Sequence, residues 1–195
     1  MYSHFTKDRD TQINNAKDLK EDKVATLTIK KTDMNDINHS LFLGNHGACC
    51  TSVGSGCNQY SAPTYVKNKM VSAIEVVDGD NFVGNTMCWI AKVDGVPSLV
   101  LDNIELKSEY HNNDSIRDAI LEYAKRMCIE MGKPDMPIYA GPNRHKLTME
   151  VYPQATHYLK IIGNTGDDEI YLDYMTDGKT IDGTDTDEVV LYKMR

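Results

Sequence analysis

The sequence lacks the segments that would direct a protein into or across a membrane. Its longest apolar runs, Val71–Val77 and Ser98–Leu101, are strand-sized and far shorter than the roughly 20 residues that a membrane-spanning helix needs. The N-terminus is polar and does not contain the apolar core of a secretory signal peptide. We therefore expect no membrane partner and a cytoplasmic location.

An excess of positive charge is also absent. The chain has 21 Lys and Arg residues against 29 Asp and Glu residues, which gives a formal net charge of −8. Because a phosphate backbone must be met by clustered Lys and Arg, this balance predicts that nucleic acid is not a partner. The five cysteines are an odd number, which favours a cytoplasmic protein over a secreted protein with paired disulfides.

What is present is enough for one domain. A chain of 195 residues can bury a hydrophobic core without disulfides or a structural metal, and two compact domains would be cramped. Residues 1–22 are charged and rich in amides without periodicity, so they are interpreted as a polar N-terminal extension or a frayed first helix. Residues 23–195 contain no internal repeat and no low-complexity linker, and are expected to form the domain.

Strand patterns dominate the domain. Val24–Lys30 alternates apolar and polar residues, as a half-buried strand does. The Asp78-Gly79 and Asp94-Gly95 turns predict three antiparallel strands in succession, because Asp-Gly between strand-like runs is a strong hairpin signal. The three strands are expected at 73–77, 82–93 and 97–106, and four further strand-sized runs lie at Met136–Ala140, His157–Ile162, Glu169–Tyr174 and Val189–Met194.

Helical signals are fewer. A short helix is expected near Asp33–Ile37 with Thr32 or Asp33 as its cap, and another within Thr64–Ser72. One long helix is predicted to begin near Ser115 and to end before Gly132 and Pro134. Its apolar residues recur at helical spacing and form one stripe: Ile116, Ala119, Ile120, Tyr123, Ala124, Met127, Cys128 and Met131. Together the patterns predict an α/β domain with a mixed sheet.

The order of these motifs resembles the GNAT superfamily of N-acetyltransferases. In that family a hairpin leads to a long strand, then to a Glu-Tyr corner, then to an acyl-coenzyme A loop and its helix. The matching residues span roughly 25–195 and are Asp78-Gly79, Phe82-Val83-Gly84, Glu109-Tyr110, Ile138–Ala140 with Asn143, and Tyr152. The resemblance implies a GNAT-like fold: a mixed, mostly antiparallel sheet flanked by helices.

The resemblance also implies an activity. The chain would be an acyl-coenzyme A-dependent N-acyltransferase that transfers an acetyl group from acetyl-CoA to a small-molecule or peptide amine. The cofactor-binding positions carried over from the family are Ile104, Leu106, His111, Asn112, Asn113, Ser115 and Asn143.

The acyl-coenzyme A loop departs from the family pattern. Asp114 and Ile116 stand where the family has the two glycines that let backbone N–H groups approach the pyrophosphate at the helix N-terminus. A carboxylate would repel the pyrophosphate, and a β-branched side chain would block it. Asp114 is therefore expected to cap the helix, and the sequence leaves open whether the cofactor binds in an altered way or not at all.

Acetyl transfer needs a base for the acceptor amine and an acid for the leaving thiolate. The strand LVLDNIELK offers Asp102 and Glu105 as the base, since a carboxylate in an apolar strand is partly desolvated. Each could instead face solvent or pair with a Lys. The acid implied by the family is Tyr152, but Pro153 follows it and its spacing from Asn143 is two residues longer than usual. Core packing or turn anchoring is the alternative role for Tyr152.

The segment from Leu43 to Ser61 is rich in glycine and cysteine and is expected to be a long loop. A nucleophilic Cys50 or Cys49, activated by His46 or His145, is one hypothesis for it. Zinc held by His46, Cys49 or Cys50, Cys57 and a distant ligand such as His39 is another, although no second C-x-x-C pair is present, and no metal site is predicted. The plain alternative is a packed loop of small thiols. Cys88 and Cys128 are expected in the core.

Three functional hypotheses remain open from the sequence. The first is the N-acyltransferase, the second is a GNAT-like recognition domain without catalysis, and the third is a cysteine-centred enzyme that uses the His46 and Cys50 loop. Gly141–Lys146 is expected to be a polar turn that opens a helix, and a site for a phosphate or carboxylate is the alternative. The acidic residues between Asp167 and Glu188 are expected to lie in solvated hairpin turns, and adventitious cation binding is the alternative.

Overall fold

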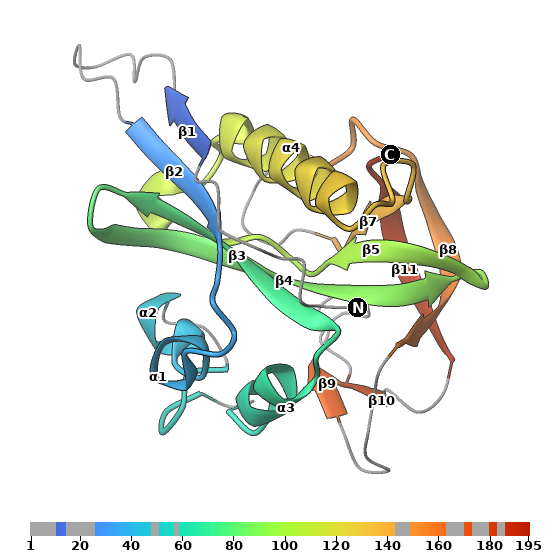
Figure 1. The fold of residues 1–195 in the computed structure, drawn as a ribbon, viewed down its shortest axis with the longest axis horizontal. Coiled ribbons are helices and arrows are strands. Elements are labelled where there is room, and N and C mark those ends of the chain that lie inside the picture. The colour runs from blue at the N-terminus through green and yellow to red at the C-terminus, as the bar shows by residue number, and fades with distance from the viewer. Residues whose placement is uncertain are drawn as a thin grey trace.

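The computed structural model describes residues 11–14, 26–47, 51–56, 59–142, 149–162, 170–172, 180–182 and 186–195. A twisted sheet runs through the centre of the molecule, with a long helix on one face and short helices on the other (Figure 1). This arrangement confirms the expected fold class, a mixed and mostly antiparallel sheet flanked by helices.

In the described part of the chain, the main sheet contains nine strands. Between neighbours the pairing is antiparallel except for β5 with β7, the one parallel pair among the described strands. The order is β1 (Thr11–Asn14), β2 (Thr26–Lys31), β3 (Val71–Asp78), β4 (Asn81–Val93), β5 (Val96–Leu101), β7 (Ile138–Ala140), β11 (Asp187–Lys193) and β8 (Gln154–Ile161), with β6 (Glu105–Leu106) also paired to β4. A separate pair consists of β9 (Ile170–Leu172) and β10 (Thr180–Asp182).

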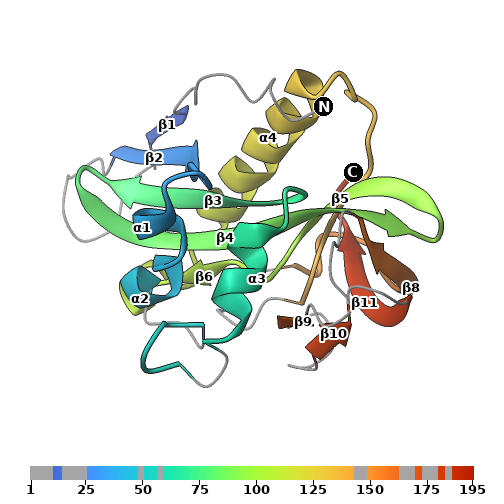
Figure 2. The same cartoon turned by 60° about the horizontal axis from the view of Figure 1, so that its bottom comes forward.

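Five of the strands close into a ring. β4 pairs with β5 along one edge, and Ala91–Val93 of the same strand pair with β8 along the other. Because β5, β7, β11 and β8 are neighbours in that order, the path returns to β4. The interior of the ring is filled by buried side chains that include Trp89, Leu159 and Leu191. Figure 2 shows β8 and β11 curving around this end of the sheet.

The long helix is α4 (Asp114–Glu130), which confirms the predicted helix. Its apolar stripe, with Ile116, Ile120 and Ala124 fully buried, packs on the sheet in one core cluster with Ile74 and Val76 of β3. The chain leaves α4 through Gly132 at a φ of 70°, a left-handed conformation that suits glycine.

The opposite face of the sheet is covered by α1 (Ile37–Ser40), α2 (Leu43–Gly47) and α3 (Ser61–Lys67) (Figure 2). The short 3-10 helix η1 (Ser108–Tyr110) lies between β6 and α4. The expected cap of the first short helix is wrong: Asp36, rather than Thr32 or Asp33, caps α1 by accepting the N–H of His39 at 3.2 Å. Helix α2 also lies within the segment that was expected to be a loop.

Both predicted hairpins are confirmed. β3 and β4 are joined at Gly79 with a φ of 57°, and β4 and β5 at Asp94 and Gly95 with φ of 51° and 82°. Two consecutive positive φ values are typical of the type I′ turn, whose twist matches that of the strands. The third strand differs from the prediction, because it is interrupted at Asp102–Ile104 between β5 and β6.

Cys88 and Cys128 lie in the core, as predicted, at 1% and 0% exposure. Burial raises the pKa of the Cys88 thiol to about 12, and the pKa of Cys128 is also raised, mainly by burial. In the described part of the chain, no helix is both long and apolar enough to cross a membrane.

Candidate functional site

The candidate site lies where β5 ends, on the face of the sheet covered by α1–α3. β4 pairs with β5 up to Cys88 opposite Leu101, and with β6 from Asn85 opposite Glu105. Between these pairs, two residues of β4 face the three residues 102–104, so the chain forms a bulge. The bulge is fixed by backbone hydrogen bonds, because the Asp102 N–H donates to the Met87 carbonyl oxygen at 2.8 Å.

The bulge places two carboxylates at one cavity. Asp102 and Glu105, both predicted as candidate bases, line a cavity of about 30 Å³ together with Asn85, Asn103 and residues of α1–α3. A cavity of this size holds one water-sized group, such as an amine nitrogen. Asp102 is buried, with 5% exposure, and its Oδ1 accepts the N–H of Asn103 at 2.8 Å. The structure therefore brings both predicted bases to one place.

Two polar atoms in the wall of the cavity are left without partners in the described structure. They are Oδ1 of Asn85, on β4, and Oγ of Ser40, at the end of α1. Both residues are buried, with 5% exposure each. Buried polar groups are nearly always hydrogen-bonded, so these two atoms suit a polar ligand or a bound water.

Asn85 belongs to a polar row that crosses four strands. Lys30 of β2 pairs with Glu75 of β3, Glu75 with Asn85 of β4, and Asn85 with Glu105 of β6. Residues directly opposite each other in a ladder point to the same face of the sheet. The row therefore connects the buried carboxylate of Glu75 to the cavity that Asn85 and Glu105 line. Sequence reasoning did not select Glu75 or Asn85.

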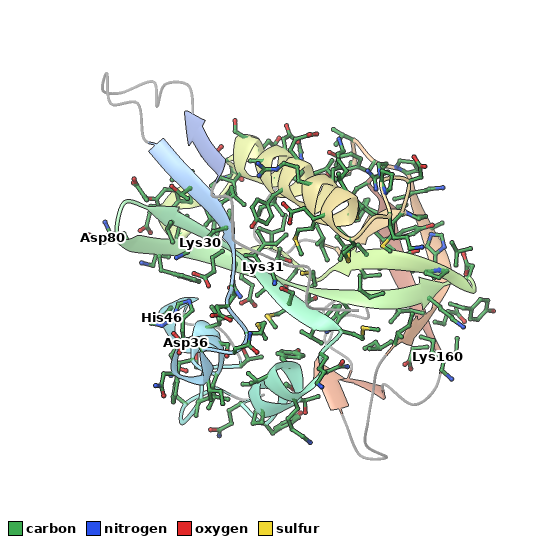
Figure 3. The ribbon with its side chains drawn as sticks, viewed as in Figure 1. Lys30, Lys31, Asp36, His46, Asp80 and Lys160 are labelled. Atoms are coloured by element: carbon green, nitrogen blue, oxygen red, sulfur yellow. The ribbon has the colours of Figure 1, made fainter. Side chains whose placement is uncertain are left out.

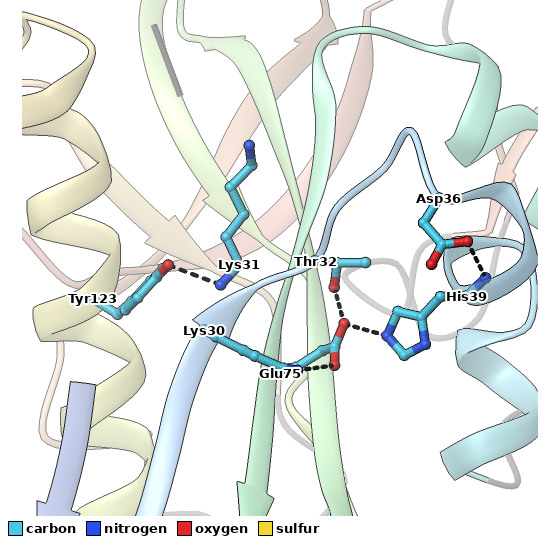
Figure 4. A network of polar contacts seen from close by, with 7 residues as sticks. All are labelled: Lys30, Lys31, Thr32, Asp36, His39, Glu75 and Tyr123. Atoms are coloured by element: carbon cyan, nitrogen blue, oxygen red, sulfur yellow. Dashed lines mark hydrogen bonds and ion pairs between the residues drawn. The ribbon is translucent and has the colours of Figure 1, made fainter. Parts of the chain in front are cut away.

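Glu75 anchors α1 to the sheet (Figure 4). The residue is 1% exposed, and its Oε1 accepts the Thr32 hydroxyl at 2.6 Å and lies 2.7 Å from Nε2 of His39 on α1. Nζ of Lys30 lies 3.9 Å from Oε2. The sequence held one signal for this residue: a single carboxylate inside the apolar run of β3, the same signal that selected Asp102 and Glu105.

His46 lies close to this network but not in it. Its ring centroid is 5.4 Å from that of His39 and 5.7 Å from that of Phe82. Its proposed partners Cys49, Cys50 and Cys57, as well as His145, lie outside the described residues. Among the described residues, no group of three His, Cys, Asp or Glu side chains is arranged to hold a metal ion.

The predicted cofactor loop connects β6 to α4. The side chains of Ile104 and Leu106 are buried in the core, so only their backbone could contact a cofactor. Nε2 of His111 lies 3.0 Å from the Leu106 carbonyl oxygen. Asn112 has a φ of 62°, which is left-handed. Ser115 lies in the first turn of α4, and Asn143 lies outside the described residues.

The expectation that Asp114 caps α4 is wrong. The N-cap is Asn113, and Asp114 is the first helical residue, with its carboxylate 3.4 Å from Nη1 of Arg117. The expected steric block by Ile116 is also absent, because its side chain is fully buried on the core side of the helix. The N–H of Ile116 donates to the carbonyl of Asn113 at 3.0 Å.

Tyr152, the predicted acid, does not line the cavity. It is half-buried against the main core, and the guanidinium of Arg117 lies 5.8 Å from its ring centroid. These contacts favour the packing role that was its alternative.

Protein-family models and curated proteins provide no match to this chain. What the site does is therefore inferred from its residues and their geometry.

Proposed function

We propose that the chain is an N-acyltransferase that moves an acyl group from acyl-coenzyme A to an amine. The observation that carries the proposal is the meeting of Asp102 and Glu105 at the bulge, beside a cavity whose wall presents an unpartnered Asn85 Oδ1. An amine nitrogen fits the cavity and would be surrounded by oxygen acceptors.

The carboxylates supply the acid–base chemistry of this proposal. An acceptor amine arrives protonated and must lose a proton before it attacks a thioester. Asp102 is held by the bulge, and Glu105 by the pairing of β6 with β4, so both carboxylates are fixed before the amine enters. We assign the proton transfer to this pair.

The loop before α4 supports cofactor binding in part. The N–H groups of Asn112, Asn113 and Ser115 have no acceptor in the described structure, and they surround the positive end of a 17-residue helix. With the side chain of Ile116 in the core, these N–H groups are the ones that would hold the pyrophosphate. The bound cofactor would supply the thioester.

Two observations favour a second candidate, a recognition domain without catalysis. Nε2 of the His111 imidazole lies within hydrogen-bond distance of the Leu106 carbonyl oxygen, at a backbone position that the family resemblance assigns to the cofactor. The carboxylate of Asp114 at the start of α4 also opposes an anion there.

Calorimetric titration with acetyl-CoA separates the two candidates. The acyltransferase must bind it, and the absence of heat at millimolar acetyl-CoA would leave the recognition domain as the function. If acetyl-CoA binds, transfer to a panel of primary amines should fall by roughly 100-fold or more in Asp102→Asn or Glu105→Gln. Glu109→Gln, an exposed carboxylate outside the cavity, is the matched control and should retain activity.

A further inference from the structure

A second cavity lies on the other face of the sheet, under the C-terminal half of α4. Its volume is about 250 Å³. It opens where β2 ends and the chain turns away from the sheet at Asp33–Asn35. The part of β3 around Ser72 is therefore no longer paired with β2. The amide N–H of Lys31 donates to the hydroxyl of Tyr123 at 2.8 Å and fixes the end of β2 against α4.

More than half of the described residues that line this cavity are apolar. Cys88, Ile90 and Leu99 of the sheet line it on one side. Four of the ten methionines in the chain also line it: Met34, Met70, Met127 and Met131. Methionine side chains are flexible and polarisable, and surfaces rich in them bind apolar groups of varied shape. We call this cavity the methionine pocket.

The charge around the methionine pocket is opposite to that of the chain. Among the described residues that line it, Lys31 and Lys69 carry positive charge and Asp33 is the one acid, although the chain has a net charge of −8. Oδ1 of Asp33 accepts from both the backbone N–H and the side-chain amide of Asn35, at 2.9 and 3.1 Å, so the carboxylate is engaged within its own turn. Among these described residues, positive charges therefore outnumber negative ones.

Lys31 reaches over the floor of the pocket. It follows Lys30 in β2, and successive residues of a strand point to opposite faces. Lys30 approaches Glu75 on the α1–α3 face, whereas the Lys31 side chain leaves in a different direction, toward the interior beside α4 (Figures 3 and 4). The positive charge of Lys31 opposes the rise that burial causes in the pKa of Cys88, which agrees with an ammonium near the pocket floor.

We propose that the methionine pocket binds an aliphatic carboxylate of medium chain length, with the chain among the methionines and the carboxylate at Lys31. At about 30 Å³ for each water-sized group, the volume accommodates roughly eight non-hydrogen atoms, which matches the eight carbons of octanoate with its carboxylate oxygens at Lys31. An apolar cavity with one or two placed polar groups is the usual form of a small-molecule site. The pocket and the proposed acyl-transfer site lie on opposite faces of the sheet, so neither proposal depends on the other.

Calorimetric titration of the full chain with octanoate tests the charge requirement. Octanoate should bind, and octylamine, which has the same chain and the opposite charge, should bind at least about fivefold more weakly. Lys31→Met should weaken octanoate binding by a similar factor. Lys30→Met, the matched control on the neighbouring position of the same strand, should not. Equal binding of octylamine, or an equal effect of the two substitutions, overturns the proposal.

The methionine methyl groups provide a second readout that needs no folded variant of Lys31. In a ¹³C-methyl spectrum of the wild-type chain, octanoate should shift the signals of Met127 and Met131. Met87 lines the first cavity, on the opposite face, and its methyl signal should remain in place. Shifts at Met87 without shifts at Met127 and Met131 would place the ligand elsewhere and overturn the proposal.

Discussion

The strength of the contacts made by Glu75 can be measured with a double-mutant cycle. Its buried Oε1 accepts the Thr32 hydroxyl at 2.6 Å, and Thr32 itself is 1% exposed. A hydrogen bond to a charged group contributes about 1.5–3 kcal/mol to stability, and a neutral one about 0.5–1.5 kcal/mol. Thr32→Val removes the donor, and Glu75→Gln converts the acceptor from charged to neutral.

We therefore expect Thr32→Val to lower the free energy of unfolding by about 1.5–3 kcal/mol in the wild-type chain, and by about 0.5–1.5 kcal/mol beside Glu75→Gln. The difference, about 1 kcal/mol, is the coupling between the two side chains. Urea unfolding followed by circular dichroism measures each value, provided that the slope with urea is unchanged.

The control is Thr28→Val, in β2 four residues before Thr32 and opposite Val77. Its effect should be the same in both backgrounds. If the two Thr32→Val values agree within about 0.5 kcal/mol, the substitutions are additive, and the charged hydrogen bond to Glu75 does not contribute as argued.

Three further predictions concern the core. Gly84→Ala should cost about 1–3 kcal/mol in urea unfolding, because a Cβ there would overlap β6, at 2.8 Å from Cδ2 and 2.9 Å from Cα of Leu106; an unchanged midpoint would contradict this. Cys88 has a pKa raised from 9.0 to about 12, so the folded state retains a proton that the unfolded state loses. The contribution of this thiol to the free energy of unfolding should be fully present below pH 9 and should fall at higher pH by up to about 1.4 kcal/mol per pH unit. Cys88→Ala should make this fall shallower. Tyr123→Phe removes the acceptor of the Lys31 N–H and should cost about 1 kcal/mol, with faster hydrogen exchange at that amide; unchanged exchange would contradict the assignment.

The elements that the sequence predicted well carry their own local signals. α4 has an apolar stripe at helical spacing and a Gly–Pro stop, and both are set within a few turns of chain. The two hairpins have Asp-Gly at their turns, where positive φ is required. In these places local sequence and tertiary packing demand the same structure.

The features that the sequence did not predict depend on contacts between distant residues. Helix α2 forms in a stretch rich in glycine, where packing against β4 overrides weak local propensity. The bulge at 102–104 depends on how β4 pairs with two separate strands. The role of Glu75 follows from His39, 36 positions away. For the same reason, the sequence indicated Asp102 and Glu105 only as isolated carboxylates. The cavity that they share with Asn85 could not be inferred without the fold.

The ring of five strands has a consequence for the order in which the protein is assembled. β11 lies between β7 and β8, with Tyr192 opposite both Ala140 and Gln154. During synthesis the chain emerges from its N-terminus, so β7 and β8 leave the ribosome before the strand that joins them. Until β11 arrives, the free edge of β7 offers unpaired backbone groups to other chains. Nascent chains that stop short of β11 should therefore aggregate or recruit chaperones, even though α4 and the β2–β5 sheet are complete.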